Sequence, residues 1–230
     1  MTPETLYNLL SWTSPAWPIG AYAHSGGLEW AVEDGLVVDR ATTEAWLADW
    51  IEHGGGWSEA VLFVHAHRAA TLGDAGVLLD LAELALALQT TAERRLETTA
   101  QGGAFRRIAR AVAPTPALAL LDGLGDEEVA YPVVAACLAA GHDTPLFLAL
   151  TAYLHGLVAN LASAAQRLIP LGQTDGQRVV AALRERVGQI TMRAAALDQR
   201  DPFEALGSAS FVADLASMAH ETQYTRLFRT

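Results

Sequence analysis

The chain has 230 residues and a mass of 24.5 kDa, which is long enough to bury a hydrophobic core and fits one domain. Apolar residues make up 51%, charged residues 18%, and the mean hydropathy is +0.20, which excludes a disordered chain. The net charge of -11 argues against nucleic-acid binding, because phosphates attract positively charged surfaces. The chain has no lysine, which excludes P-loop nucleotide binding and Schiff-base catalysis.

The cysteine content and the N-terminus indicate a cytoplasmic protein. Cys137 is the single cysteine and lies in an apolar run, so one chain cannot build a disulfide framework or a thiolate zinc site. The first ten residues lack the basic and apolar regions of a secretory signal. The uncharged segment between Asp143 and Arg167 is long enough to span a bilayer, but polar residues interrupt it and no basic cluster flanks it. We therefore expect a buried helix there and no membrane association.

Apolar spacing and capping residues predict helices along the whole chain. The expected ranges are 2–11, 28–35, 43–53, 59–71, 76–89, 91–112, 126–140, 144–168, 176–197 and 211–222. A rigid loop with Pro15 and Pro18 follows the first helix, and the glycine run 54–56 is expected to end another. No stretch alternates with period two, so a sheet has little support. The sequence predicts one compact all-α domain, 1–230, of nine or ten helices around the 144–168 helix, which would be roughly 37 Å long.

The string 23–27 approaches the nucleophile elbow of α/β-hydrolases, with Ser25 as the nucleophile. The elbow requires a strand directly before the serine, whereas a proline-rich segment precedes Ser25. A hydrolase is therefore the weakest of the functional alternatives.

Histidines offer no strong metal site within one chain. His65 and His67 would point in nearly opposite directions on a helix, and the other histidines are separate in the sequence. A weak or intersubunit nickel site through His24 or His220 stays open, which would make the protein a nickel-binding metallochaperone.

Arginines and aromatic residues form two candidate docking surfaces. Five arginines fall between Arg94 and Arg110, which indicates either a solvated face or a patch for an acidic partner. The tail 223–230 combines aromatic and arginine side chains, the types that dominate interface energetics. It is expected to be either a partner-binding extension or a segment docked on its own domain.

Four strings spread along the chain form a specific combination of motifs. The first, 14–29, contains a proline loop, an aromatic position at Tyr22 and a Gly-Leu-Glu ending, and the second comprises Glu93, Arg95, Gly102 and Phe105. The third, 171–178, contains a Gln-x-Asp-Gly-Gln segment, and the fourth is 214–229. Together the strings resemble the UreF family of urease accessory proteins, and the fourth is close to its C-terminal signature. The chain departs from common members in having Gly26 and Gly27 together before the next helix.

The resemblance implies an all-α protein without catalytic activity that joins the accessory protein UreD, called UreH in some organisms, to the GTPase UreG. In that family, GTP hydrolysis by UreG is coupled to nickel delivery into apo-urease, where a lysine becomes carbamylated. The chain would carry no cofactor or metal, would form a homodimer within the complex, and its termini would become ordered on binding UreD. The absence of lysine agrees, because the partner would hold the nucleotide.

The matching motifs and the tail give the expected partner-binding residues. Each has a structural alternative: Glu29 could favour the start of its helix through the macrodipole, and the two glutamines could cap or bridge helices. The residues are Tyr22, His24, Glu29, Gln173, Asp175, Gln177, His220, Glu221, Tyr224, Arg226, Leu227 and Phe228.

Overall fold

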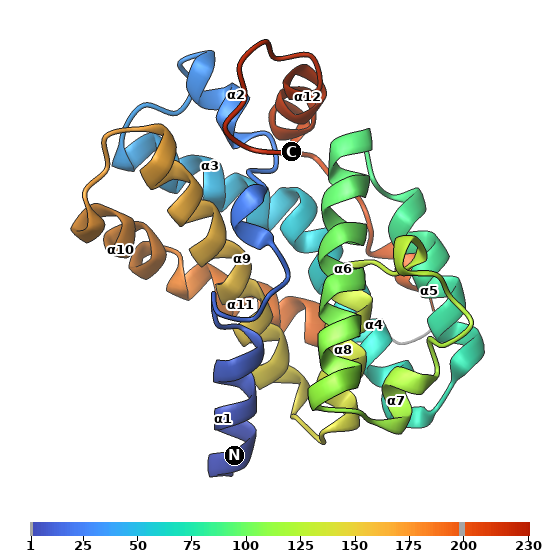
Figure 1. Cartoon of the computed structure of the whole chain (residues 1–230). Coiled ribbons are helices and arrows are strands. Elements are labelled where there is room, and N and C mark those ends of the chain that lie inside the picture. The colour runs from blue at the N-terminus through green and yellow to red at the C-terminus, as the bar shows by residue number, and fades with distance from the viewer. Residues whose placement is uncertain (1, 198–200) are drawn as a thin grey trace.

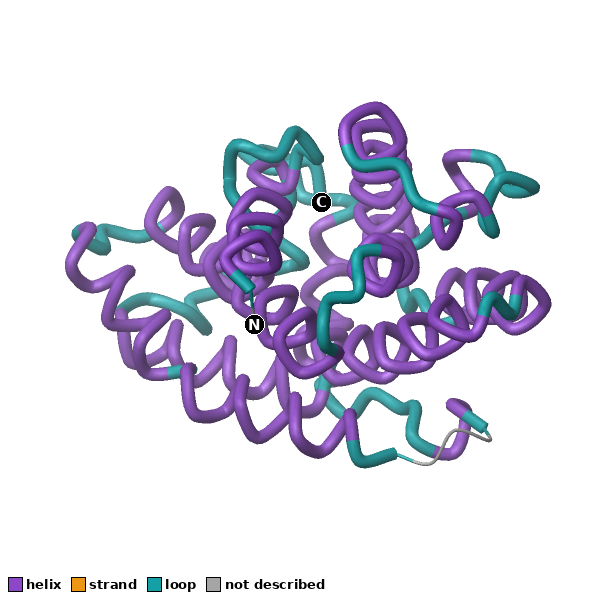
Figure 2. Tube along the Cα trace, turned by 90° about the horizontal axis from the view of Figure 1, so that it is seen from below, coloured by secondary structure: helices purple, strands orange, loops and turns teal. Residues whose placement is uncertain are grey.

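The computed structural model describes residues 2–197 and 201–230, and in these ranges helices are joined by loops with no strand (Figures 1 and 2). The expected all-α class and single compact domain are confirmed. The α-helices are α1 (Pro3–Trp12), α2 (Leu28–Glu33), α3 (Arg40–His53), α4 (Gly55–Leu72), α5 (Ala75–Ala87), α6 (Ala92–Val112), α7 (Pro116–Ala119), α8 (Tyr131–Gly141), α9 (Leu146–Leu168), α10 (Gln173–Ala182), α11 (Arg184–Ala195) and α12 (Phe211–His220). Short 3₁₀ turns are η1 (Ala21–Ala23), η2 (Asp126–Glu128) and η3 (Pro202–Glu204).

Local capping sets where several helices begin. The Thr2 hydroxyl accepts the Thr5 N–H before α1, and the Thr91 hydroxyl accepts the Arg94 N–H before α6. Asp39 and Thr42 form a reciprocal capping box, which moves the start of α3 three residues ahead of the expected position 43.

The described residues hold twelve α-helices, compared with nine or ten expected. The range 176–197 forms two α-helices, α7 was not expected, and the range 126–140 forms a 3₁₀ turn followed by one α-helix. The range 126–140 begins as η2, because Pro132 cannot sit inside a helix and instead occupies the first turn of α8. The range 176–197 bends at the buried Leu183, so that α10 packs on α3 and α11 packs on α4. Both helices retain contact with α9.

The glycine run forms a tight corner between α3 and α4. Gly54 ends α3 as expected, but Gly55 and Gly56 already belong to α4. A Cβ on Gly56 would lie 2.7 Å from the Cα of Ile51. The two helices can meet this closely only because position 56 has no side chain.

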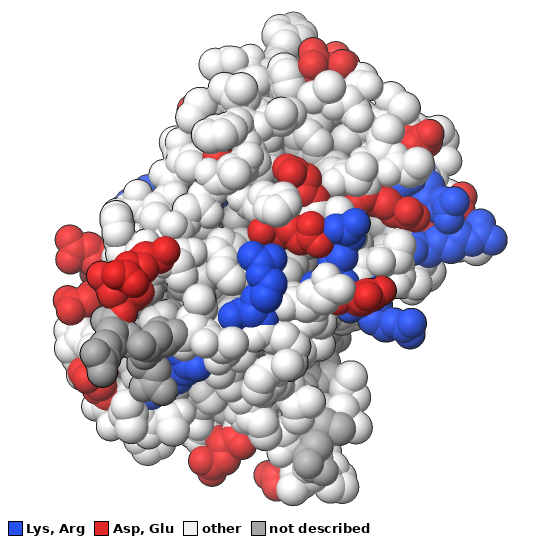
Figure 3. Space-filling view, turned by 180° about the vertical axis from the view of Figure 1, so that it is seen from behind, with Lys and Arg blue, Asp and Glu red and all other residues white. Residues whose placement is uncertain are grey.

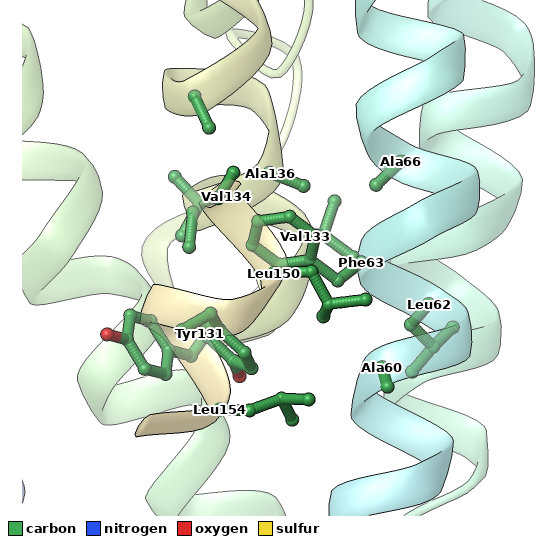
Figure 4. Packing of buried hydrophobic residues seen from close by; sticks show 14 of the residues in the cluster. Ala60, Leu62, Phe63, Ala66, Tyr131, Val133, Val134, Ala136, Leu150 and Leu154 are labelled. Carbon is green, nitrogen blue, oxygen red and sulfur yellow. The ribbon is translucent and has the colours of Figure 1, made fainter. Parts of the chain in front are cut away.

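The core lies where α4 and α8 pack together and α9 covers them (Figure 4). Phe63 of α4 lies between Val133 of α8 and Leu150 of α9 (Figure 4).

Cys137 is buried in α8, and burial raises the pKa of its thiol to about 12, so the thiol stays protonated and unreactive.

The long helix α9 is the expected axis, because it contacts α1, α2, α3, α4, α8, α10 and α11. In the described part of the chain it is the one helix long and apolar enough to cross a membrane, with 39% of its apolar window buried. Core helices of soluble proteins meet the same criterion.

Candidate functional site

The tail 223–230 folds back on the loop before α2, so two segments that are far apart in the sequence lie side by side (Figure 1). The Arg229 N–H donates to the Ala23 carbonyl at 2.8 Å, and the Ser25 N–H donates to the Thr230 carbonyl at 2.7 Å. The His24 ring pairs with the Thr230 hydroxyl at 2.7 Å. The tail is therefore held to the domain by main-chain hydrogen bonds.

The carboxylate of Glu29, in the first turn of α2, is the main acceptor for the tail. It is only 6% exposed and accepts the N–H groups of Leu227 at 2.5 Å and Phe228 at 2.8 Å. His220 Nε2 lies 3.0 Å from the same carboxylate. Hydrogen bonds to a buried carboxylate are stronger than those between neutral groups, so Glu29 fixes the tail backbone.

His220 links Glu29 on α2 to Glu93 on α6. Its Nδ1 lies 2.7 Å from Glu93, and the ring is fully buried. Each ring nitrogen therefore faces a carboxylate oxygen. Arg226 donates to the other Glu93 oxygen at 2.9 Å. These four residues, here called the clasp, place the His220 ring and the Arg226 guanidinium against two buried carboxylates, which offsets the cost of burying Glu29 and Glu93.

Phe228 anchors the tail by packing as well as by its backbone. The ring is 3% exposed and belongs to a second hydrophobic cluster with Leu28 and Ile169. The Arg167 guanidinium lies over the ring, 4.2 Å from its centroid.

The clasp leaves several apolar side chains exposed beside it. Tyr224 is fully exposed, and Leu227 is 63% exposed although its N–H is bound to Glu29. On α12, Phe211, Leu215 and Met218 are also exposed and share one face, because they are spaced four and three residues apart. We call these three residues the α12 ridge. Sequence reasoning missed the ridge, although its helical spacing was visible in the sequence.

The structure separates the expected partner-binding residues into exposed and buried groups. His24, Glu29, His220 and Phe228 are buried and hold the tail in place. The exposed residues are Tyr22, Gln173, Gln177, Glu221, Tyr224, Arg226 and Leu227, and Asp175 is half-buried. Partner contact by the exposed group stays a prediction.

The expected residues also divide by location. Gln173, Asp175 and Gln177 lie on α10, which packs on α3, α9 and α11 and lies apart from the tail (Figure 1). Asp175 pairs with Arg178 within the helix. Glu221 accepts the Ala92 N–H at 3.0 Å and so caps α6 beside the clasp.

The hydrolase interpretation of Ser25 has no structural support. The Ser25 hydroxyl is buried and donates to the Thr230 carbonyl at 3.0 Å. The residue leads into α2 through two glycines with positive φ, and the described ranges contain no strand to build an elbow.

Four histidines, His24, His65, His67 and His220, are buried inside the fold. His65 and His67 both lie on α4, and His67 Nε2 pairs with the Thr144 carbonyl at 2.9 Å. Burial lowers the pKa of His24 and keeps its ring neutral, while His220 has both nitrogens engaged by carboxylates. Within residues 2–197 and 201–230, no group of three histidine, cysteine or acidic residues could hold a metal. The intersubunit nickel site therefore gains no support.

The arginines between Arg94 and Arg110 are largely engaged in ion pairs. Arg106 is buried and donates to Asp126 at 2.6 Å, and Arg110 pairs with Asp122. Hydrogen bonds from Arg106 and Arg107 lower the pKa of Asp126. On the face seen in Figure 3, basic and acidic side chains lie next to one another and form no separate basic patch.

A sequence model of the UreF family matches residues 37–184, more than half of the chain. The chain belongs to the UreF family of urease accessory proteins. UreF from Rhodopseudomonas palustris strain HaA2 is 48% identical over 229 residues, covering 98% of this chain and 94% of the relative. UreF from R. palustris strain BisB18 is 51% identical (98% and 92% covered), and UreF from Bradyrhizobium sp. strain BTAi1 is 50% identical (98% and 92%). These alignments cover nearly the whole chain, whereas the family match excludes the N-terminal loop and the tail.

Proposed function

We propose that this UreF-family protein is a non-enzymatic adaptor that joins UreD, or UreH, to the GTPase UreG in the cytoplasm. In this role it couples GTP hydrolysis by UreG to the insertion of nickel into apo-urease. The observation that best supports the adaptor role is the docked tail, which leaves Tyr224 and Leu227 exposed a few residues after the α12 ridge in the chain.

The tail and the ridge have the properties of a binding surface. Exposed aromatic and large apolar side chains supply most of the energy of protein interfaces. The backbone at Leu227 is already fixed by Glu29, so a partner would not have to order that part of the chain. We assign this surface to UreD.

The proposed homodimer has a second surface available on α1 and α9. No charged residue lies between Asp143 and Arg167, yet part of α9 faces solvent. α1 packs on α9 and exposes Tyr7 and Leu10. Two copies with a net charge of -11 repel each other least where their surfaces carry no charge.

The adaptor role is tested by co-expressing the chain with UreD and UreG of the same organism and purifying through a tag on UreD. We expect all three proteins to co-elute, and UreG to be lost when this chain is omitted. Elution of UreD alone, with the other two proteins soluble and folded, would contradict the proposal.

The UreD surface is tested with the double variant Tyr224→Ala/Leu227→Ala. Both side chains are exposed, so we expect at least a tenfold loss of UreD binding and an unchanged melting temperature. Leu72→Ala/Val112→Ala, which also truncates two exposed apolar residues, serves as the matched control and should bind normally. Equal binding by both variants would remove the tail from the interface.

A further inference from the structure

A cavity of about 530 Å³ lies between the proline loop after α1, the first half of α6 and the second half of α9. Its volume falls in the range of sites that hold small ligands or single side chains, roughly 300–1,000 Å³. Of the residues considered for partner binding, only Tyr22 and Arg94 line it. The cavity is therefore a feature separate from the clasp and the α12 ridge.

The charged residues lining the cavity do not balance. Arg94 donates to Glu97 at 2.6 Å and to Glu59 at 3.2 Å. Two carboxylates thus share one guanidinium, which leaves one excess negative charge when both are ionised. Burial raises the pKa of Glu59, and the Tyr153 hydroxyl donates to it at 2.6 Å. The excess charge therefore arises only above this raised pKa of Glu59, where a further cation in the cavity would offset it.

The lining also contains aromatic rings. Trp12, Trp17, Trp50 and Tyr131 all contribute to the cavity wall. Trp17 Nε1 is buried and has no hydrogen-bond partner in the part of the chain that the structure describes, so its N–H can donate to a ligand that carries an acceptor besides its cationic group. Aromatic rings combined with carboxylates recognise organic cations, because the ring face is negative.

We propose that this cavity binds an organic cation with a guanidinium or ammonium group, held by Glu97 and the surrounding aromatic rings. A metal ion fits less well, because the described residues offer no group of three metal-ligating side chains. The cation can be a free small molecule or an arginine or lysine side chain of a partner, since both present the same chemistry.

The first test titrates the purified chain at pH 8 with agmatine, a small guanidinium compound, and follows tryptophan fluorescence. We expect a saturable change with agmatine and with N-acetylarginine amide. The uncharged analogue N-acetylcitrulline amide should bind at least tenfold more weakly. Saturation by the citrulline compound at the same concentration, or no saturable change with agmatine, overturns the proposal.

The second test changes the charge of the lining. Glu97→Gln leaves Arg94 balanced by Glu59 alone, so agmatine binding should weaken at least tenfold. Glu185→Gln removes an exposed carboxylate from α11 and serves as the control with unchanged binding. Unchanged affinity in Glu97→Gln contradicts the proposal.

A third variant tests the site independently, so that the proposal can still be contradicted if Glu97→Gln does not fold. Ser163 is exposed at the α9 wall of the cavity, so Ser163→Arg places a tethered guanidinium beside it. Binding should be lost in Ser163→Arg and kept in Ser163→Gln, and equal binding by the two would overturn the site.

The source of the cation is distinguished by a pentapeptide with one central arginine. Binding tighter than that of agmatine assigns the cavity to a partner's side chain, and weaker binding assigns it to a free cation. Nickel chloride that displaces agmatine and depends on Glu97 to the same degree would instead indicate a metal site and overturn the assignment to an organic cation.

Discussion

The carboxylate of Glu29 accepts the backbone N–H of Phe228 at 2.8 Å, although 199 residues separate them in the sequence. The acceptor lies in the first turn of α2, and the donor belongs to a tail whose ring is buried in the same region. One carboxylate therefore determines whether the exposed end of the chain has a fixed shape.

Glu29→Gln should release the tail. The Leu227 and Phe228 N–H groups donate to the two different oxygens of Glu29. The amide replaces one of these oxygens with an NH₂ group, which is a donor, so at least one of these hydrogen bonds is lost. We expect the free energy of unfolding, measured with urea, to fall by about 2–3 kcal/mol. Trypsin cleaves only after arginine in this lysine-free chain, so cutting after Arg226 should accelerate.

The control for this prediction is Glu185→Gln on the exposed surface of α11. It should leave the urea midpoint and the tryptic pattern unchanged. A stable and protease-resistant Glu29→Gln protein would show that Phe228 packing and the main-chain bonds to Ala23 and Ser25 hold the tail without Glu29.

Gly27→Ala should destabilise the contact between α2 and α12. Gly27 has φ +87°, and a Cβ there would lie 2.7 Å from the backbone nitrogen of Ser217. Gly35→Ala is the matched control, because Gly35 has φ +78° but no atom within 4 Å of its Cβ position. Conformational strain should cost both variants about 1 kcal/mol, and the clash should cost Gly27→Ala about 1–3 kcal/mol more in thermal unfolding. Equal melting temperatures would contradict the close approach.

His24 should make stability depend on pH below about 6.5. Burial lowers the pKa of its imidazole below the ordinary 6.5, with nearby Glu97 opposing the shift. The unfolded chain therefore binds a proton more readily, and the free energy of unfolding should fall as pH drops below 6.5, by at most about 1.4 kcal/mol per pH unit.

Other buried groups contribute to the same pH range. His65 and His67 have pKa values lowered by burial and act in the same direction, whereas Glu59, with a raised pKa, acts in the opposite direction above pH 4.5. The measurement is therefore the difference in slope between the unmodified chain and His24→Gln, from urea titrations at pH 8 to 5. A slope that His24→Gln leaves unchanged would remove His24 from this effect.

Tyr153→Phe tests the hydrogen bond to the buried Glu59. The hydroxyl donates at 2.6 Å, and its loss leaves that carboxylate with Arg94 as its remaining donor among the described residues. We expect a loss of about 1–3 kcal/mol in the free energy of unfolding. Tyr7→Phe removes a hydroxyl from an exposed ring on α1 and should cost less than about 0.5 kcal/mol.

Helix positions followed from the sequence where the signal was local. The capping residues Thr2 and Thr91 predicted the starts of α1 and α6, and the apolar run predicted α9 to within two residues. These signals act over a few residues, so they can be read from the sequence. The bend at Leu183 was missed, because it depends on α10 and α11 each packing on a different neighbour. The early start of α3 could have been found from the Asp39 and Thr42 capping box.

The candidate site was predicted by residue type but not by arrangement. Aromatic and arginine residues in the tail suit either a partner or the chain's own domain, and the structure shows that some tail side chains are buried and others exposed. Phe228 is buried while Tyr224 is fully exposed. Which tail residues are buried depends on long-range pairing, such as that of His220 with Glu29 and Glu93. No local sequence pattern encodes contacts across 191 and 127 residues.

The closure of the tail on α2 also bears on synthesis. Glu29 leaves the ribosome well before the N–H groups that it binds, which lie 198 and 199 residues later in the chain. The domain core can form before that point, because α4, α8 and α9 all precede the tail. A molecule that is trimmed or terminated before Phe228 would fold its core but would lack the buried ring and the N–H bond to Glu29 that anchor the tail. The arrangement therefore restricts the proposed UreD surface to molecules whose synthesis has reached the tail.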